Sequence, residues 1–477
     1  MGAGGQGRLA SPTMTPPLAR PTTSLSGGVG VAAHSPATAA AGMALLDAGG
    51  TAADAAVGMT LAACAVEPFV VSLLSGLHGI HVDVDGTTRA VDGFVDVPAV
   101  PTGGRRAETT IDFGGARVPY SIGGATFGTP GLVAGCWHLH RRFGRLPWAE
   151  VVAPAIEWAG TGFVLTDRDE SLLHMLEPVM TLGVGREVFC VDDRMRVEGE
   201  LVRIPDLADA LRQIAEEGGP TLYEGAMSRE LVTFAEEVGA LVTAEDLAAC
   251  TAVEHTPPTV RLGGWQVRSR RGLSPLTDWV ARLDASDGSH AARLALAQSP
   301  IPPKALGTTS LAATDADGRA CAVTASLGLG TGDWFRGSQL NSMLGEVDLL
   351  VGGLRPRTRM GSMMAPTAVV SPTGQATVLG AAGGSRIPSA LLRTIDGIVL
   401  GELDATAAVD LPRIHRVGEV VHVEPHLEDR DEAALVAAGF TVQRWTSRHH
   451  FFGGVSVAGA AGTQGDPRRG GVGLAHR

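Results

Sequence analysis

The residue types that could do chemistry concentrate in a short stretch about two-thirds of the way along the chain. Gly307 is followed by Thr308 and Thr309, and the next residues read as a strand, an Asp-Gly turn and a second strand. If the chain is cut before Thr308, the new α-amino group lies beside the threonine hydroxyl. An α-amine has a pKa of about 7.7–8.0, which suits a general base. Thr308 would then supply both nucleophile and base.

The same residue could make the cut. The Thr308 hydroxyl would attack the carbonyl carbon of residue 307, and water would open the resulting ester. Gly307 favours this step because glycine tolerates a distorted backbone and places no side chain in the way. A threonine pair is also an ordinary way to begin a strand, so the dipeptide carries little weight by itself.

A second requirement is a group that stabilises a negatively charged oxygen. Gly383 and Gly384 follow a predicted strand at 376–379 and precede a predicted helix at 388–399. Backbone amides at such a turn can point at an oxyanion. Because two glycines before a helix often form only a turn, this motif also needs support from the rest of the chain.

The elements around these residues indicate an α/β (α+β) protein. Helices at both ends of the chain with strands between them favour stacked sheets covered by helices. The segment 308–386 is predicted to be mostly strand, and residues 1–29 to be a disordered tail rich in Gly, Pro, Ser and Thr. Patterning predicts a hairpin at 80–91 and further helices at 36–47, 51–67, 132–143, 148–160, 205–217, 226–238, 243–250 and 402–409.

Composition narrows the function. The chain has 477 residues, of which 44% are hydrophobic and 18% charged, so it can bury a large core. The net charge is −12 and no long basic run occurs, which disfavours nucleic acid and anionic membranes as partners. Five scattered cysteines without C-x-x-C spacing indicate reduced thiols. With no signal peptide or long apolar run, we expect a cytoplasmic protein.

Metal and nucleotide sites receive little support. His415, His422 and His426 surround Glu424, but alternating positions on a strand or a solvated rim explain them better than a metal. Asp315 precedes an Asp-Gly pair that lacks the later glutamate of a calcium loop, so it indicates a hairpin turn. No G-x-x-x-x-G-K motif occurs. We therefore expect no metal and no cofactor.

Many segments, in order along nearly the whole chain, together resemble the γ-glutamyltranspeptidase family of N-terminal nucleophile hydrolases. That resemblance implies a four-layer αββα sandwich and an acyl-enzyme that hydrolyses or transfers a small-molecule amide. It implies autocleavage into a large subunit, 30–307, and a small subunit, 308–477. The two subunits would stay associated, and whether they assemble into a higher oligomer is left open. The segments that carry it are 33–39, 46–56, 66–68, 143–148, 223–225, 241–247, 307–309, 340–346, 362–367, 383–387, 412–415 and 466–471.

The resemblance also implies roles for single residues. Thr308 would be the nucleophile, Ser326 the hydroxyl that supports its amine and hydroxyl, and Gly383 with Gly384 the oxyanion hole. Cleavage would fall between Gly307 and Thr308. The positions implied for substrate binding are Phe94, Thr309, Asn341, Met343, Glu346, Gly361 and Ser362.

The departures from the family pattern concern the substrate clamp. Phe94 stands where the family's γ-glutamyl enzymes have an arginine for the substrate α-carboxylate, and Gly361 replaces one serine of a pair. Met343, Glu346 and, across a shortened loop, Gly328 align with the groups that hold the α-amine. Losing a buried arginine–carboxylate pair costs about 3–5 kcal/mol. These changes predict an acyl group other than γ-glutamyl, more apolar or flatter, unless a cation replaces the missing charge from among Arg105, Arg106, Arg359 and Arg386.

Two alternatives stay open. Some relatives in actinobacterial pathways to 4-alkylproline building blocks break a carbon–carbon bond next to a carbonyl, and this chain could do the same. A family member that has lost its activity and acts as a binding protein is the other. The intact Gly307, Thr308, Ser326 and glycine pair favour an enzyme, because a binding role needs none of them.

Overall fold

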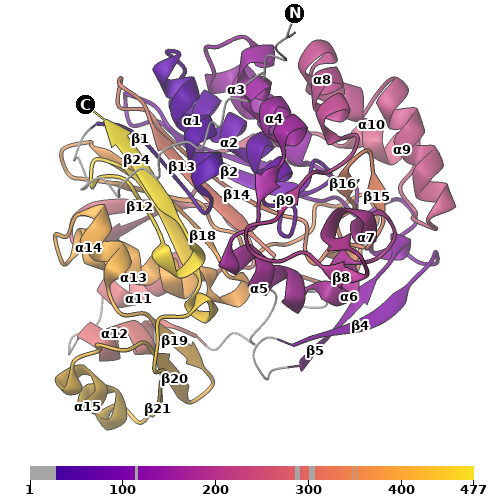
Figure 1. The fold of residues 1–477 in the computed structure, drawn as a ribbon. Coiled ribbons are helices and arrows are strands. Elements are labelled where there is room, and N and C mark those ends of the chain that lie inside the picture. The colour runs from indigo at the N-terminus through magenta and orange to yellow at the C-terminus, as the bar shows by residue number, and fades with distance from the viewer. Residues whose placement is uncertain are drawn as a thin grey trace, which may run out of the picture.

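The computed structural model describes residues 28–112, 117–284, 290–299, 307–346, 349–350 and 352–476. The tail predicted at 1–29 lies almost entirely outside the described residues. Two antiparallel sheets stack face to face at the centre of the molecule (Figure 1). This arrangement is the pair of inner layers expected of an αββα sandwich.

The first sheet has seven strands and carries the strand that follows Thr308. Its neighbours pair antiparallel throughout, and β13 and β14 form the hairpin predicted around the Asp-Gly turn. Its strand order is β10 (Val253–His255), β3 (Thr88–Gly93), β2 (Gly76–Val82), β14 (Ala320–Ser326), β13 (Thr309–Thr314), β1 (Val29–Ala33) and β24 (Val472–His476).

The second sheet has six strands and carries the glycine pair. Gly383 follows the last residue of β18, and Ala382 of that strand pairs with Gly454 of β22. The strand order is β11 (Thr259–Leu262), β12 (Trp265–Ser269), β17 (Thr367–Val370), β18 (Ala376–Ala382), β22 (Gly454–Gly459) and β23 (Gln464–Gly465).

Helices cover both outer faces, which completes the predicted αββα layers (Figure 1). Every residue of α2 is buried, and Thr51 with Asp54 forms a capping box at its start. The seven-stranded sheet is covered by α1 (Pro36–Asp47), α2 (Ala52–Val66) and α3 (Leu132–Phe143), with α4 (Trp148–Thr161) packed on α2, and the six-stranded sheet by α11 (Leu276–Asp284), α13 (Ile387–Val399) and α14 (Ala405–Asp410).

Small side chains fill the space between the two sheets. The buried cluster there consists mainly of alanines, together with Ile80, Val82 and Val378. Alanine carries only a methyl group, so two sheets lined with it can approach closely. The high alanine content of the chain thus serves both the inner layer and the α1–α2 contact.

The remaining elements surround this sandwich. They are α5 (Asp167–Met175), α6 (Glu177–Met180), α7 (Val184–Phe189), α8 (Leu207–Glu217), α9 (Ala226–Glu237), α10 (Ala244–Ala249), α12 (His290–Ala297), α15 (Asp429–Ala437), β4 (Ala107–Asp112), β5 (Arg117–Ile122), β6 (Phe163–Val164), β7 (Cys190–Val191), β8 (Arg194–Met195), β9 (Leu201–Val202), β15 (Trp334–Phe335), β16 (Ser338–Gln339), β19 (Ile414–Val417), β20 (Val420–Val423) and β21 (Thr441–Arg444). The predicted helices are confirmed to within a few residues at their ends.

One segment differs from its prediction. Only the two ends of 308–386 form long strands, because the described part of 327–366 holds only the two-residue strands β15 and β16. Gly328, Gly330 and Gly332 all have positive φ there, a conformation that interrupts a strand. This irregular segment lies at the end of the sheets where β13 begins.

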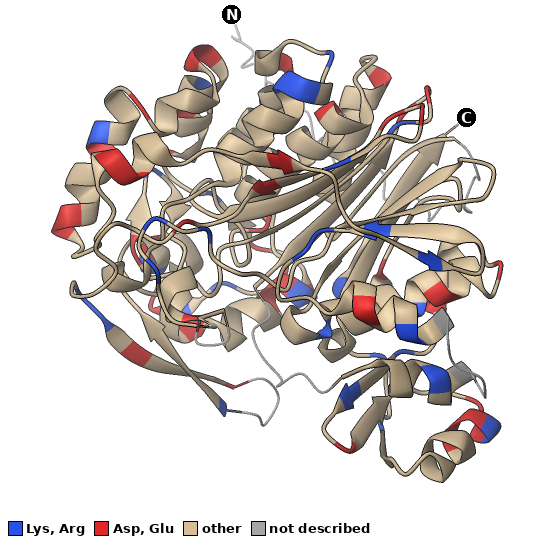
Figure 2. Ribbon diagram, turned by 180° about the vertical axis from the view of Figure 1, so that it is seen from behind, with Lys and Arg blue, Asp and Glu red and all other residues tan. Residues whose placement is uncertain are grey.

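The strand directions bring the predicted chemical groups to one end of the sandwich. Thr309, the first residue of β13, pairs with Ala325 near the end of β14, and Ser456 Oγ of β22 donates to Ser310 O across the sheets at 2.8 Å. Figure 2 shows few charged residues on the central strands and both signs interspersed on the helices and loops. No helix in the described residues is long and apolar enough to cross a membrane.

Candidate active site

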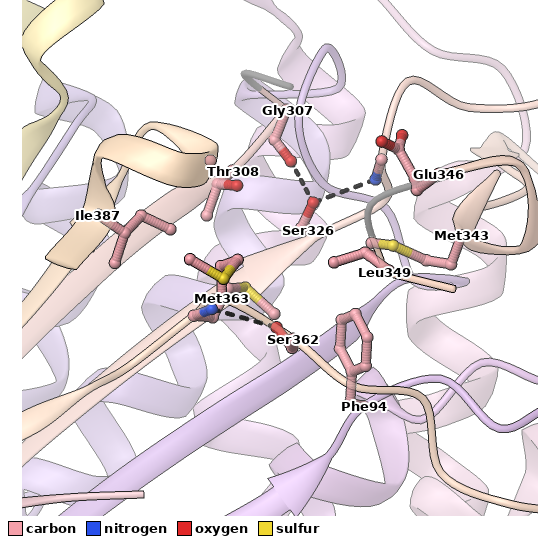
Figure 3. A pocket seen from close by; sticks show the side chains of 13 residues that line it. Phe94, Gly307, Thr308, Ser326, Met343, Glu346, Leu349, Ser362, Met363 and Ile387 are labelled. Atoms are coloured by element: carbon pink, nitrogen blue, oxygen red, sulfur yellow. Dashed lines mark hydrogen bonds between the residues drawn. The ribbon is translucent and has the colours of Figure 1, made fainter. Parts of the chain in front are cut away.

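A pocket opens at the end of the sandwich where β13 begins. Its empty volume is about 430 Å³, which includes the solvent-filled opening of the pocket. Figure 3 shows side chains from both sheets and from the irregular 327–366 segment pointing into it. We call this the acyl pocket; its lining residues are Phe94, Gly307, Thr308, Ser326, Gly328, Met343, Glu346, Leu349, Ser362, Met363, Met364, Gly384 and Ile387.

The Gly307–Thr308 peptide lies against Ser326 in the uncut chain. Ser326 Oγ donates a short hydrogen bond to the Gly307 carbonyl oxygen and accepts one from Gly328 N at 3.1 Å (Figure 3). Thr308 is 6% exposed. A hydroxyl that donates to a carbonyl oxygen withdraws electron density from the carbonyl carbon, the atom that a nucleophile attacks.

Space explains why residue 307 is a glycine. A Cβ atom at this position would overlap the carbonyl oxygen of Gly328. Gly328 has φ +73°, and a Cβ there would come within 2.8 Å of both Glu346 Oε1 and Ser342 Oγ. The 326–330 loop is fixed in turn, because Ser342 Oγ accepts from the amides of Leu329 and Gly330 at 3.1 Å. The backbone at the cut is therefore closely packed on one side.

The glycine pair sits at the end of β18, as predicted. Gly384 lines the acyl pocket together with Thr308, whereas Gly383 does not. Gly383 has φ +142°, and a Cβ there would lie 2.8 Å from Gly453 Cα. Glycine is required at 383 by both its conformation and this close approach.

Two of the predicted substrate-binding residues are occupied with the protein itself and lie outside the pocket lining. Thr309 Oγ1 donates to Glu67 Oε2 at 2.7 Å, and Thr38 Oγ1 donates to the other oxygen at 2.7 Å. Asn341 Nδ2 donates to Leu74 O and Gly128 O, both at 2.8 Å. These contacts tie together segments that are distant in the sequence around the site.

Phe94 forms one wall of the acyl pocket and separates it from a buried ionic network. The ring is 1% exposed and stacks on His78 with centroids 5.1 Å apart. Behind it, Arg359 pairs with Asp92 at 2.9 Å, and Arg270 approaches the same carboxylate at 3.5 Å. Burial raises the pKa of Asp92, but His78 and the two arginines outweigh burial and bring it to about 2.

No replacement cation faces the acyl pocket among the residues described. Its described lining contains no Lys, Arg or His, and its single ionisable carboxylate is that of Glu346, 2% exposed. Arg359 is engaged with Asp92 and Asp96, and Arg105 pairs with Asp333 at the surface. The two other candidates from the sequence, Arg106 and Arg386, are not part of the lining either.

Three more of the residues expected to bind substrate lie in the pocket lining, and a fourth lies outside it. Ser362 lines the pocket and its Oγ accepts from Met364 N at 3.1 Å, whereas Gly361 lies outside, where a Cβ would come within 2.9 Å of Leu273. Met343 and Glu346 also line it. Sequence reasoning missed Leu349, Met363, Met364 and Ile387, which carry no chemical motif and are brought to the pocket by the fold.

The histidines near Glu424 have other neighbours. His415 Nδ1 lies 2.9 Å from Ser389 Oγ, and Trp445 Nε1 donates to His422 Nδ1 at 3.2 Å. Glu424 pairs with Arg468. No group of three or more potential metal ligands occurs in the described part of the chain.

Comparison with known proteins adds to this geometry. The family model described as gamma-glutamyltranspeptidase matches residues 38–274 and 280–475. The glutathione hydrolase proenzyme of Escherichia coli strain K12 is 26% identical over 457 residues, which cover 78% of each chain. The capsule biosynthesis protein CapD proenzyme of Bacillus anthracis is 25% identical over 487 residues, 90% of this chain and 86% of that one.

A solved structure shows the same fold. Cephalosporin acylase from Bacillus halodurans superposes with a TM-score of 0.80 at 21% identity, over 98% of this chain and 100% of that one. Thus the sandwich, the segments in order and the family match agree. The chain belongs to the γ-glutamyltranspeptidase family and is an enzyme of the amide-hydrolysing and acyl-transferring kind.

Proposed function

We propose that the chain is an autoprocessed hydrolase or acyltransferase that forms an acyl-enzyme at Thr308. The observation that carries the proposal is the Ser326 hydroxyl on the carbonyl of Gly307, next to Thr308, at the mouth of a buried pocket. A peptide bond in a purely structural turn needs no hydroxyl donor on its carbonyl oxygen. A self-cleaving one gains from it, because negative charge develops on that oxygen.

Processing would follow from these contacts. Thr308 Oγ1 attacks the carbonyl carbon of Gly307, and Ser326 Oγ–H stabilises the oxygen as it becomes negative. The hydroxyl proton passes to the Thr308 nitrogen as the C–N bond breaks, which leaves an ester between Gly307 and the Thr308 side chain and a free amine on Thr308. Water hydrolyses the ester, which releases the carboxylate of Gly307 and restores the hydroxyl.

The mature centre would use the new amine as its base. The amine takes the proton of the Thr308 hydroxyl as the oxygen attacks a substrate carbonyl, and returns it to the leaving group. The amides at Gly383 and Gly384 are suited to hold the oxyanion, with Gly384 the nearer to the pocket. Water or an acceptor amine then releases the acyl group.

The substrate of this enzyme is proposed to carry an acyl group other than γ-glutamyl. Phe94, Met343, Leu349, Met363 and Met364 present an apolar wall, and no cation in the described lining would meet an α-carboxylate. Burying an unpaired carboxylate there would cost several kcal/mol. An apolar acyl group that extends toward these side chains avoids that cost.

Two measurements test the proposal. On a denaturing gel, the purified protein should resolve into products that end at Gly307 and begin at Thr308, while Thr308→Ala stays whole. Mass spectrometry with a panel of acyl p-nitroanilides should show release of apolar acyl groups ahead of γ-glutamyl. A wild-type protein that never cleaves and releases no acyl group contradicts the proposal. Oxo-acid substrates in the same panel test carbon–carbon cleavage.

We also propose that the two products remain one assembly in the cytoplasm. Both sheets contain strands from both regions, so separation would expose the core; in the seven-stranded sheet, β13 lies between β1 and β14. All five cysteines are free thiols, as suits a reducing compartment. Size-exclusion chromatography of the cleaved protein and cell fractionation test these two points.

A further inference from the structure

A buried carboxylate contacts the residue that directly follows Thr308. Glu67 is 5% exposed and is the C-terminal cap of α2. One of its oxygens accepts from Thr309 Oγ1 and the other from Thr38 Oγ1, both at 2.7 Å. A hydroxyl that donates to a carboxylate at this distance makes one of the stronger hydrogen bonds found in proteins. Glu67 therefore fastens the first residue of β13 to α1.

Alternation along β13 places Thr308 on the opposite face of the strand from Thr309, because successive side chains of a strand point to opposite faces. Thr309 points toward the helix layer, where it meets Glu67. Ser310 points toward the six-stranded sheet, since a Cβ at Gly380 would overlap its Oγ. Thr308 shares the face of Ser310 and lines the acyl pocket there (Figure 3). The contact with Glu67 thus orients the strand from behind without occupying the pocket.

The start of β13 is held unevenly by its two neighbours in the sheet. On one side, Thr309 pairs with Ala325 at the end of the ladder with β14. On the other side, the ladder with β1 covers Ala312–Thr314, further along the strand. The hydrogen bond to Glu67 is therefore an added attachment at the point where the backbone pairing of β13 is least complete.

The turn that begins with Glu67 also reaches the strand that carries Ser326. Glu67 O accepts from the amides of Val70 and Val71 at 3.1 and 3.2 Å. Val70 O in turn accepts from Leu327 N at 3.1 Å, and Leu327 directly follows Ser326. One short turn therefore contacts the neighbours of both hydroxyl groups that the proposed function uses.

Self-cleavage would remove one of the two covalent restraints on Thr308. In the uncut chain, the peptide on its N-terminal side is held by Ser326 and packs against Gly328. After the cut, Thr308 is a chain terminus, and a terminus is poorly ordered unless other contacts tie it down. The hydrogen bond from Thr309 to Glu67 is a tie that the cut leaves intact.

We propose that Glu67 is a positioning residue, which acts through Thr309 to keep the amine and hydroxyl of the cleaved Thr308 at the acyl pocket. This role rests on the proposed function, because it concerns turnover by the mature enzyme. It separates two rates. Loss of the Thr309 hydroxyl should spare self-cleavage, for which Ser326 holds the Gly307 peptide, and should slow the reaction that follows.

The experiment compares hydroxyl variants of the full-length protein, with self-cleavage followed on a gel and turnover measured on the acyl p-nitroanilide that wild type releases fastest. Thr309→Val keeps the shape of the side chain and removes the donor. It should cleave to completion but lose about 10- to 100-fold in kcat at unchanged KM, the loss expected when a reacting group is misplaced by about 1 Å. Thr309→Ser restores the donor and should recover most of the kcat. Thr309→Ala, which adds no bulk, is the second variant and should show the same split as valine.

The matched control is Thr38→Val, which removes the other hydroxyl from the same carboxylate without altering β13. It should lower the urea midpoint about as much as Thr309→Val and keep the kcat of wild type. Wild-type kcat in Thr309→Val, an equal loss of kcat in Thr38→Val, or loss of self-cleavage in Thr309→Val would each overturn the role of Glu67 alone. A wild-type protein that neither cleaves nor releases an acyl group would overturn the proposed function and this role with it.

Discussion

Arginines lie near the catalytic end of the sandwich in two regions, behind Phe94 and beside the glycine pair, and those behind Phe94 are paired with carboxylates. On the acyl side, Arg270 and Arg359 pair with Asp92 and Asp96, and the ring of Phe94 closes the network off from the pocket. Near the glycine pair, Arg469 packs against Gly454, forms no ion pair with a described carboxylate and keeps a buried Nε and Nη2 without described partners. The difference lies in the counter-charge, because Arg270 also keeps a buried Nε without a described partner but faces the carboxylate of Asp92.

The largest expected effect near these two regions comes from the loss of Thr308 itself. Thr308→Ala should abolish self-cleavage and lower turnover at least about 1000-fold, because nucleophile and base are lost together. The measurement is a denaturing gel plus product release by mass spectrometry. Thr308→Ser keeps a hydroxyl and should still cleave.

The next largest effect concerns the uncut peptide. Ser326→Ala removes the donor on the Gly307 carbonyl and should slow self-cleavage about 100- to 1000-fold, the loss typical of one oxyanion donor. A time course of the purified precursor on a gel measures the rate. Ser362→Ala removes a different hydroxyl from the lining of the same pocket; it is the control and should cleave at the wild-type rate. Equal rates for both variants would refute the role given to Ser326.

A third change sharpens the acyl side. Phe94→Ala should lower the free energy of unfolding by about 3–5 kcal/mol, since it empties a buried ring site. It should also reduce the preference for apolar acyl groups, because the wall in front of Arg270 and Arg359 is removed. Urea unfolding and the acyl panel give the two readings. Phe127→Ala, at a fully buried ring outside the pocket, should cost similar stability with unchanged preference.

The smallest effect is a pH dependence behind Phe94. The pKa of Asp92 is about 2 in the fold and near 3.8 in a free chain, so the folded value is depressed. Its contribution of about 2 kcal/mol is therefore present above pH 4 and lost as the pH falls toward 2. Urea midpoints between pH 5 and 2 should fall less steeply for Asp92→Asn. The same slope for both proteins would contradict the pairing.

Local sequence features predicted the parts of the site that depend on neighbours in the chain. The Asp-Gly turn fixes the β13–β14 hairpin, and the hairpin brings Ser326 back to Gly307. The glycine pair could be placed because it ends a strand. The loss of the arginine that holds a substrate α-carboxylate could be predicted from the sequence, because Phe94 stands at its position within a segment that resembles the family.

The rest depends on contacts between distant segments. Thr309 meets Glu67, 242 positions away, and Asn341 meets carbonyls of two other loops. Nothing in the spacing of Met363 or Leu349 indicates that they share a pocket with Phe94. Arg168 of α5 approaches Gly470 near the end of the chain, where a Cβ would lie 3.4 Å from Arg168 Cδ, and no local sequence feature predicts this contact.

A self-cleavage site is usually described as a short recognition sequence, but the contact of residue 307 with Gly328 gives this one a spatial definition. Any side chain at 307 would overlap the Gly328 carbonyl oxygen and push the scissile carbonyl away from Ser326. Gly307→Ala should therefore leave an intact fold that cleaves slowly. For protein engineering, the volume of the side chain at residue 307 would therefore set the rate of self-cleavage. Adding one methyl group there would slow maturation while Thr308 stays unchanged.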